Sequence, residues 1–393
     1  MSFLLPAPAT TIQRFETKPI LEIRERLERN ENRDLLPAQD DRTLLASRWR
    51  IGSRIVDKKS GITGEFAVQF LHNLHWSKAR NNSQEDLEVY LASIRRTEKN
   101  GADWQLGRQR IQIGKGRLVG IPNWGASSRT QDGLRVKSKE WEAIAFYPSL
   151  GIYSRPQNAR FFSLSRSRGT ELTYAALKAA KVSGKSTSVF TLAQENELKL
   201  GKQTFGYFVA GQLGTSEGKD LAAWQVRLDG STPIDSKTRA IAELGWVSGG
   251  QSATKTSTFE WYFPRTNSYY GIGDVIGGRN IREFVLGINS KPAKAWEFEA
   301  NYRKFDLFNK KERLFGNNGL AIRRSGGEYF DPTGAAGSDV GSEINIRTYF
   351  RPNAQTEWVA GFAAFQPGKF MKSFLGNGAK SMNYYFIQYQ FRL

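Results

Sequence analysis

The sequence contains no cysteine and only two histidines in 393 residues. Without cysteine, disulfide scaffolds, thiolate metal sites and cysteine nucleophiles are excluded. His72 and His75 are three residues apart, which on a strand puts them on opposite faces, so we expect no metal site from them. No nucleophile, base and oxyanion site can be assembled from the remaining residues. We therefore expect neither an enzyme nor a bound cofactor.

Long apolar runs are missing as well. The mean hydropathy is −0.51, and no run approaches the roughly 20 apolar residues that a membrane-spanning helix needs. This excludes a helical membrane protein but not a transmembrane β-barrel, because strands with alternating lipid-facing and lumen-facing residues have a polar average composition. The 10 Trp, 14 Tyr, 25 Phe and 38 Gly fit that class.

The charge is strongly one-sided, with 57 Lys+Arg against 38 Asp+Glu and a formal net charge of +19. Such a charge first suggests nucleic acid as a partner, then a membrane surface, then an acidic polysaccharide. The first ten residues show no recognisable secretory signal, since their short apolar stretch is interrupted by Pro6 and Pro8. This predicts either an intracellular protein or a mature form with an added initiator methionine.

Alternation with a period of two residues recurs from end to end and predicts strands. At the C-terminus, one face carries Tyr385, Ile387, Tyr389, Phe391 and Leu393, and the other carries Gln388, Gln390 and Arg392. A strand with an aromatic face and a polar face is typical of the closing strand of a barrel, although an amphipathic edge strand has the same pattern.

The connections distinguish a barrel from a sandwich. We expect about 18 strands (16 is the alternative), beginning near residues 18, 43, 64, 87, 104, 132, 141, 170, 186, 204, 220, 236, 252, 280, 295, 340, 356 and 383. Tight turns are expected at residues 98–101, 183–185, 248–250, 291–293 and 352–354. Longer segments are expected at residues 114–131, 150–169, 264–279, 307–339 and 367–382. Short turns at one end and long loops at the other indicate an all-β antiparallel outer-membrane barrel with both termini on the periplasmic side.

No second domain is expected. Residues 1–16 lack alternation and are predicted to be a short N-terminal periplasmic arm, while residues 17–393 form a single barrel. Gating loops are most plausible at residues 114–131 and 307–339, which are long and contain Gly, Lys and Arg.

Strand parity places many arginines in the predicted lumen, where charged walls of one sign select ions of the opposite sign. Arginine suits carboxylated solutes because its forked guanidinium binds carboxylates bidentately and stays charged. The predicted lumen arginines are Arg24, Arg26, Arg48, Arg50, Arg108, Arg110, Arg135, Arg303 and Arg347. The alternative is that each arginine only pairs with a lumen glutamate to fill the interior.

Three stretches resemble the alginate-export family of outer-membrane barrels. The first is GRQRIQIGKGRLVGIPNWGASSRTQDGLRV, from Gly107 to Val136. The second is Gly273-Asp274 followed by Gly277-Gly278-Arg279-Asn280, and the third runs from the strand at Val340–Ile344 to the loop at Phe365–Phe370. With the entry strand Glu22–Glu28, the resemblance spans nearly the whole chain.

This resemblance implies a monomeric 18-stranded barrel in the outer membrane of a Gram-negative cell, with an arginine-rich lumen that conducts an anionic polysaccharide outward, and periplasmic export partners. The positions that match the motifs, besides Arg108 and Arg135, are Arg117, Trp124, Arg129, Asp132, Asp274, Arg279 and Asn280.

Three functions stay open. The first is a passive anion-selective channel for an alginate-like uronate polysaccharide, with outer-membrane lipid and the solute as its partners. The second is a general porin for small organic anions. The third, from a different class, is a soluble basic β-protein that binds nucleic acid.

Overall fold

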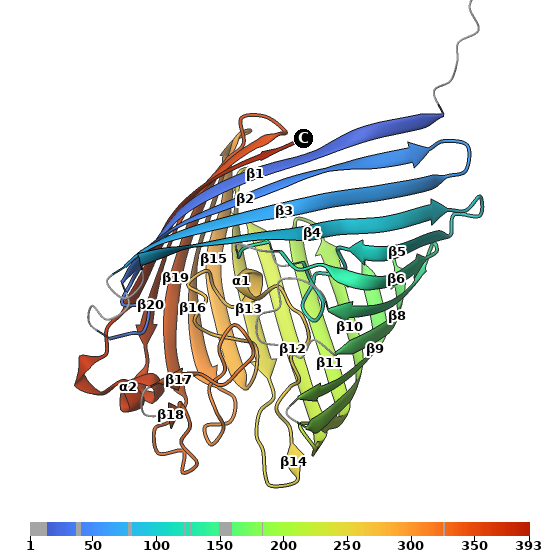
Figure 1. Cartoon of the computed structure of the whole chain (residues 1–393). Helices are drawn as coiled ribbons and strands as arrows, with labels where there is room; N and C mark the ends of the chain where they lie inside the picture. The colour runs from blue at the N-terminus through green and yellow to red at the C-terminus, as the bar shows by residue number, and fades with distance from the viewer. Residues whose placement is uncertain are drawn as a thin grey trace, which may run out of the picture.

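A computed structural model describes residues 14–36, 41–77, 81–121, 123–125, 128–148, 159–182, 184–324 and 327–393. Within them the chain forms one antiparallel barrel, seen from the side in Figure 1. Of the 21 strands in the described part, β14, β17 and β18 are two-residue strands in loops, which leaves 18 in the barrel wall. This confirms the predicted fold class and strand number.

The first half of the wall contains four long strands followed by five shorter ones. Their bounds are β1 (Phe15–Glu31), β2 (Arg42–Asp57), β3 (Ile62–Ser77), β4 (Asn81–Thr97), β5 (Asp103–Gln109), β6 (Gln131–Lys137), β7 (Trp141–Pro148), β8 (Arg160–Arg168) and β9 (Glu171–Val182).

The second half completes the ring. Its strands are β10 (Lys185–Leu200), β11 (Gln203–Ser216), β12 (Lys219–Pro233), β13 (Thr238–Val247), β15 (Ile281–Ala293), β16 (Trp296–Leu307), β19 (Asp339–Phe350), β20 (Thr356–Pro367) and β21 (Met382–Arg392). The ring closes where β1 pairs with β21, from Glu22 opposite Arg392 to Glu31 opposite Asn383.

The outer surface carries a continuous apolar band. In the register, Ile94 of β4, Leu106 of β5 and Leu134 of β6 lie side by side, and the first two are 63% and 64% exposed. Exposed tryptophans stand near the short-turn ends of four strands, as in the aromatic girdle of a membrane barrel. They are Trp104, Trp141, Trp296 and Trp358. A surface this apolar is suited to lipid rather than to a polyanion in water, so the soluble nucleic-acid-binding alternative is not supported.

The predicted closing strand is confirmed as β21. Tyr385 and Ile387 are 42% and 49% exposed, whereas Gln388 and Gln390 are 9% and 2% exposed. The polar face therefore points inward and the aromatic face points to lipid. Residues 1–13 of the predicted N-terminal arm lie outside the described residues, and β1 already begins at Phe15.

The strand prediction contains two errors, one missed strand and one extra strand, which leave the predicted number of wall strands at 18. The predicted loop at 150–169 contains β8, and the predicted strand near 252 is not part of the wall. The sequence hides β8 because its inward residues are Phe161, Ser163 and Ser165 rather than charged side chains. They face the interior, where Phe161 packs on Tyr262 with ring centroids 5.7 Å apart.

The connections at the short-turn end have at most five residues, and the long connections lie at the other end. Two predicted turns lie at the long-loop end instead. The one at 183–185 falls between β9 and β10, with residue 183 outside the described residues, and residues 248–250 begin a long loop. The long loops comprise residues 110–130, 248–280 and 308–338. The second carries β14 (Lys255–Thr256) and α1 (Thr266–Tyr269), and the third carries β17 (Arg323–Arg324) and β18 (Gly327–Glu328). Residues 368–381 carry α2 (Lys369–Leu375) and η1 (Gly376–Gly378).

These helices are short, and none in the described part of the chain is long and apolar enough to cross a membrane.

Candidate functional site

Two of the long loops fold into the barrel and meet there. The 110–130 loop and the 248–280 loop share a parallel bridge between Val119 and Phe263. The amide of Gly120 donates to the carbonyl of Phe263 at 2.9 Å, and the amide of Phe263 donates to the carbonyl of Leu118 at 2.7 Å. Figure 1 shows the segment with α1 inside the ring of strands. The lumen is thus narrowed by main chain as well as by side chains.

Apolar side chains hold these loops inside. Ile111 and Val119 are fully buried, as are Tyr262 and Phe263. Phe263 packs against Phe146 of β7 with ring centroids 5.7 Å apart. Burying aromatic side chains of this size contributes about 1.5–3 kcal/mol each, so the two loops are an integral part of the interior.

Tyr269, in the 248–280 loop, contacts both the 110–130 loop and the barrel wall. Its hydroxyl donates to the carbonyl of Lys115, and its own carbonyl accepts a hydrogen bond from Arg303 at 2.7 Å. The guanidinium of Arg117 lies 4.5 Å from its ring centre. Burial raises the pKa of the Tyr269 hydroxyl, which keeps it a hydrogen-bond donor at neutral pH.

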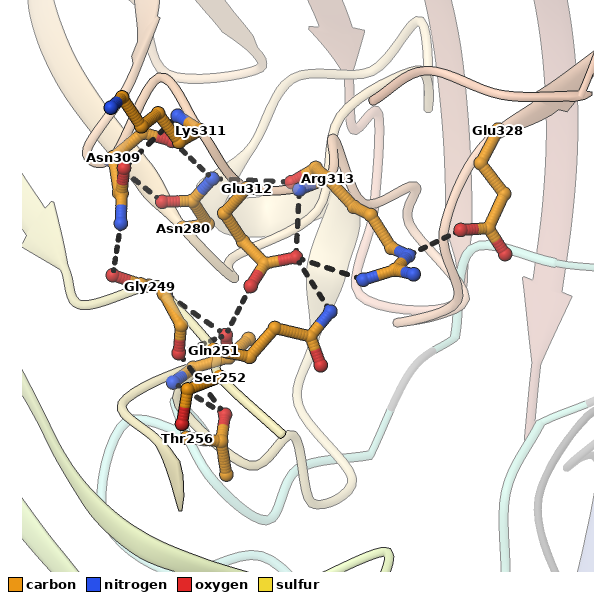
Figure 2. Close-up of polar contacts among 12 residues, drawn as sticks. Gly249, Gln251, Ser252, Thr256, Asn280, Asn309, Lys311, Glu312, Arg313 and Glu328 are labelled. Carbon is orange, nitrogen blue, oxygen red and sulfur yellow. Dashed lines mark hydrogen bonds and ion pairs between the residues drawn. The ribbon is translucent and has the colours of Figure 1, made fainter. Parts of the chain in front are cut away.

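A third loop is joined to the second by the polar cluster in Figure 2, centred on the buried carboxylate of Glu312. Its oxygens accept hydrogen bonds from the side chain of Gln251 at 3.2 Å and from the amide of Arg313 at 2.8 Å. Beside it, the side-chain amide of Asn280 donates to the backbone carbonyls of Asn309 and Arg313, both at 3.1 Å. Hydrogen bonds therefore join the 248–280 and 308–338 loops into one unit at the long-loop end.

Four of the predicted lumen arginines form a basic wall on β1 and β2. Arg24 and Arg48 are 1% and 0% exposed, and Arg26 and Arg50 are both 3% exposed. Arg48 and Arg50 share the carboxylate of Glu22, at 2.7 and 2.9 Å. These guanidinium groups lie on the inward face as predicted, but protein atoms cover them.

Arg24 and Arg26 anchor the 110–130 loop to this wall. Arg24 donates to the carbonyls of Asn123 and Gly125 at 2.7 and 2.6 Å. Arg26 lies 4.6 Å from the ring centre of Trp124 and pairs with Glu28 at 2.5 Å. Charge-assisted hydrogen bonds to backbone carbonyls of this kind contribute about 1.5–3 kcal/mol each.

Arg108 does not lie in the lumen, so this part of the prediction is wrong. In the register it pairs with Ala92, on the same side of the wall as the lipid-facing Ile94 and Leu106. It donates to both oxygens of Asp132, at 2.7 and 2.8 Å, so both residues lie on the outer face near the long-loop end. Gly107 has φ +112°, but the register with β4 continues through it, so Arg108 keeps the outward face of Leu106.

The other predicted arginines lie elsewhere on the inner surface. Arg135 donates to Glu142 at 2.6 Å near the short-turn end, and Arg347 pairs with Glu299 at 2.5 Å. Arg303 pairs with the buried Glu283 at 2.6 Å. Arg110 is exposed where the chain leaves β5, and within the described residues it has no hydrogen bond or ion pair. The positive charges of Arg110 and Arg50 repel each other.

With this geometry established, known proteins can be compared. A family model described as alginate export matches residues 206–387. No curated protein sequence matches the chain. Solved structures of outer-membrane proteins from Pseudomonas aeruginosa match over 96% of this chain: OccK1 (OpdK), with TM-score 0.64, 11% identity and 98% of its own chain covered, and OprD, with 0.61, 10% and 93%. OccK2 (OpdF), solved in complex with glucuronate, gives 0.61, 12% and 97%.

The chain resembles alginate-export barrels over residues 206–387, and its fold is that of an outer-membrane β-barrel. The matched region contains the second and third motifs predicted from the sequence, while the first, at Gly107–Val136, lies outside it.

In this alginate-export-like barrel the motif residues tie the loops together. Arg117 pairs with Asp229 of β12 at 3.1 Å. Arg129 donates to the carbonyl of Phe263, and burial lowers the pKa of this guanidinium to about 10, so it stays charged at neutral pH. Arg279 donates to the carbonyls of Phe259 and Gly319, at 3.0 and 2.8 Å. These three motif arginines thus bind the loops that narrow the lumen, whereas the motif residues Arg108 and Asp132 lie on the outer face.

Asp274 and Asn280 have positive φ angles of 62° and 52°. Asn280 is fully buried. The Asp274 carboxylate accepts a hydrogen bond from Asn267 at 2.8 Å, and burial raises its pKa to about 6. Asparagine and aspartate tolerate this left-handed conformation better than most residues, which explains these residue types at two bends of the loop.

The sequence prediction missed the polar contacts made by inward loops. Lys115 pairs with Glu197 at 3.0 Å, and its amide donates to Glu195 at 2.8 Å. The one available signal was the dense run Phe259-Glu260-Trp261-Tyr262-Phe263 in a segment too irregular for the barrel wall. In the described residues no cluster of three or more His, Cys, Asp or Glu is arranged to hold a metal ion.

Proposed function

We propose that this outer-membrane channel is selective for anions and conducts a carboxylated, alginate-like uronate polysaccharide. The observation that carries the proposal is the charge of the basic wall where β1, β2 and β21 meet. Among the described residues, the carboxylates of Glu22, Glu28 and, in the 248–280 loop, Asp274 lie beside five guanidinium groups. These guanidinium groups are those of Arg24, Arg26, Arg48, Arg50 and Arg392.

The charge acts at a distance even though most of these arginines are covered. A wall of one sign beside a narrow aqueous path lowers the barrier for ions of opposite sign, because low-dielectric surroundings screen its field poorly. Buried arginines can therefore select anions without binding them tightly. The exposed Arg110 is the guanidinium best placed to touch the solute directly.

The identity of the solute rests on chemistry shared with similar proteins. One of the similar structures holds glucuronate, and the matched family is described as exporting alginate. Both names refer to sugars with a carboxylate. We infer that the channel acts as a monomer without a cofactor, performs no bond chemistry, and receives its cargo from periplasmic export partners.

The alternative is a general porin for small organic anions. Conductance of the purified protein in planar lipid bilayers separates the two. Under a salt gradient, the expected reversal potential is that of an anion-selective channel, and oligogalacturonate is expected to block the current where monomeric galacturonate does not. Equal block by monomer and oligomer favours the general porin, whereas cation selectivity or no conductance overturns the proposal.

A further inference from the structure

A cavity of about 1070 Å³ lies at the short-turn end of the barrel. It is lined by the ends of β10 to β13, by β15 and β16, and by the turns around Gly201 and Asp235. It shares no residue with the loops that narrow the lumen. Its wall residues face inward, since Lys199 alternates with the lipid-facing Leu198 and Leu200, which are 48% and 63% exposed.

The lining is predominantly cationic. Its basic residues are Lys199, Lys202, Lys237, Arg239 and Lys291, and its acidic residues are Asp235 and Glu297. The cavity is as large as the pockets of about 300–1,000 Å³ that hold small ligands in other proteins. It can therefore take several groups of a flexible anion at once.

Both acidic residues are already engaged. Asp235 accepts hydrogen bonds from the amides of Lys237 and Thr238, at 2.7 and 2.8 Å, and these bonds lower its pKa. Glu297 pairs with Arg351 at 2.8 Å. Their carboxylates hold the turn and the strand ends, and the charge of Asp235 also acts on Lys237. Two carboxylates against five basic side chains still leave the lining with an excess of positive charge.

Three of the lysines are free for a ligand. Lys199, Lys202 and Lys237 are exposed, and the described part of the chain gives their ammonium groups no ion-pair partner. Lys291 is held by Glu297 only at 3.8 Å. Arg239, by contrast, is fixed by Ser231 and by the carbonyl of Lys202 at 3.1 Å, so it contributes charge rather than a mobile donor.

We propose that Lys199, Lys202 and Lys237 form a capture site, the lysine pocket, that binds a carboxylated sugar chain on the periplasmic side before it enters the lumen. The inference rests on the proposed function and adds to it the side of the barrel from which the sugar chain enters. Lysine suits this role because its ammonium is a hydrated point charge on a flexible stem, so it holds and releases each carboxylate instead of clamping it. Weak contacts at several points are what conduction requires.

The experiment compares sided block of the full-length channel in planar bilayers. The chain lacks cysteine, so Ser60→Cys in the β2–β3 turn and a membrane-impermeant thiol reagent fix the orientation of the inserted protein. Oligogalacturonate is then added to each chamber in turn. The test variant combines Lys199→Gln, Lys202→Gln and Lys237→Gln. The matched control removes three exposed lysines from other short turns, by Lys59→Gln, Lys99→Gln and Lys139→Gln.

In the unmodified channel, block is expected at lower concentration from the short-turn side. Loss of three exposed charge contacts predicts about tenfold weaker block in the test variant, with block in the control unchanged. Equal block in the test variant and the unmodified channel, or the same loss in the control, overturns the lysine pocket while anion selectivity stands. An unmodified channel without anion selectivity overturns the proposed function, and with it this inference.

Discussion

The hydroxyl of Tyr269 donates a hydrogen bond to the carbonyl of Lys115, so the 248–280 loop holds the 110–130 loop inside the lumen. Removing this hydroxyl by Tyr269→Phe leaves a carbonyl without its donor at a cost of about 1–3 kcal/mol. We expect faster fluctuations of the single-channel current and unchanged folding of the barrel. The control is Tyr207→Phe, on β11 outside the constriction. Equal current noise in both variants contradicts a holding role for Tyr269.

The buried Asp274 makes the loop sensitive to pH. Burial raises its pKa from 3.8 to about 6, so its carboxyl favours the packed loop when protonated. This contribution is complete below pH about 4 and is lost as the pH rises through about 6, a change of about 3 kcal/mol. Current fluctuations are therefore expected to increase over that interval in the unmodified channel and to stay constant in Asp274→Asn.

Asp331 provides the control for this pH dependence. It lies in the 308–338 loop, where hydrogen bonds from backbone amides, first that of Ala336, lower its pKa to about 2. Its charge does not change over the same interval, so Asp331→Asn should keep the pH response of the unmodified channel. A pH response that survives Asp274→Asn assigns the titration to another group.

The two faces of the wall near the end of β5 give a test of selectivity. Arg110 is exposed beside the lumen loops, whereas Arg108 is paired with Asp132 on the outer face. Arg110→Gln is expected to lower the anion preference measured from reversal potentials, and Arg108→Gln to leave it unchanged. A larger effect of Arg108→Gln contradicts the placement of this residue.

Glu312 is expected to keep the outer loops ordered. Glu312→Ala leaves the donors of Gln251 and Thr258 without their acceptor, and losses of this kind cost about 1–3 kcal/mol each. Limited trypsin digestion of the protein in liposomes should then cut faster at Lys310 and Lys311. Asp220→Ala, an exposed carboxylate on β12, is the control, and equal rates in the two variants contradict the role of Glu312.

The barrel wall could be predicted from the sequence because period-two alternation is a local property. The inward Gln388 and outward Ile387 follow directly from it. The constriction could not be predicted in this way, since Arg24 reaches the carbonyl of Asn123 across 99 residues and no local pattern encodes that contact. Arg108 was misplaced because it was assigned to the same face as Arg110, which lies beyond the end of β5, whereas the outward Leu106 two residues before it gives the face of the strand itself.

The pairing of β1 with β21 also constrains how the protein is made. Arg24 lies opposite Gln390, so the ring cannot close until the last strand has been synthesised and delivered. Contacts this distant in sequence form slowly, because a long loop must close first. Glu22 pairs with Arg48 of β2 and lies 3.5 Å from Arg392 of β21. The carboxylate of Glu22 therefore joins the first strands to the last one, and the basic wall is complete only when the barrel has closed.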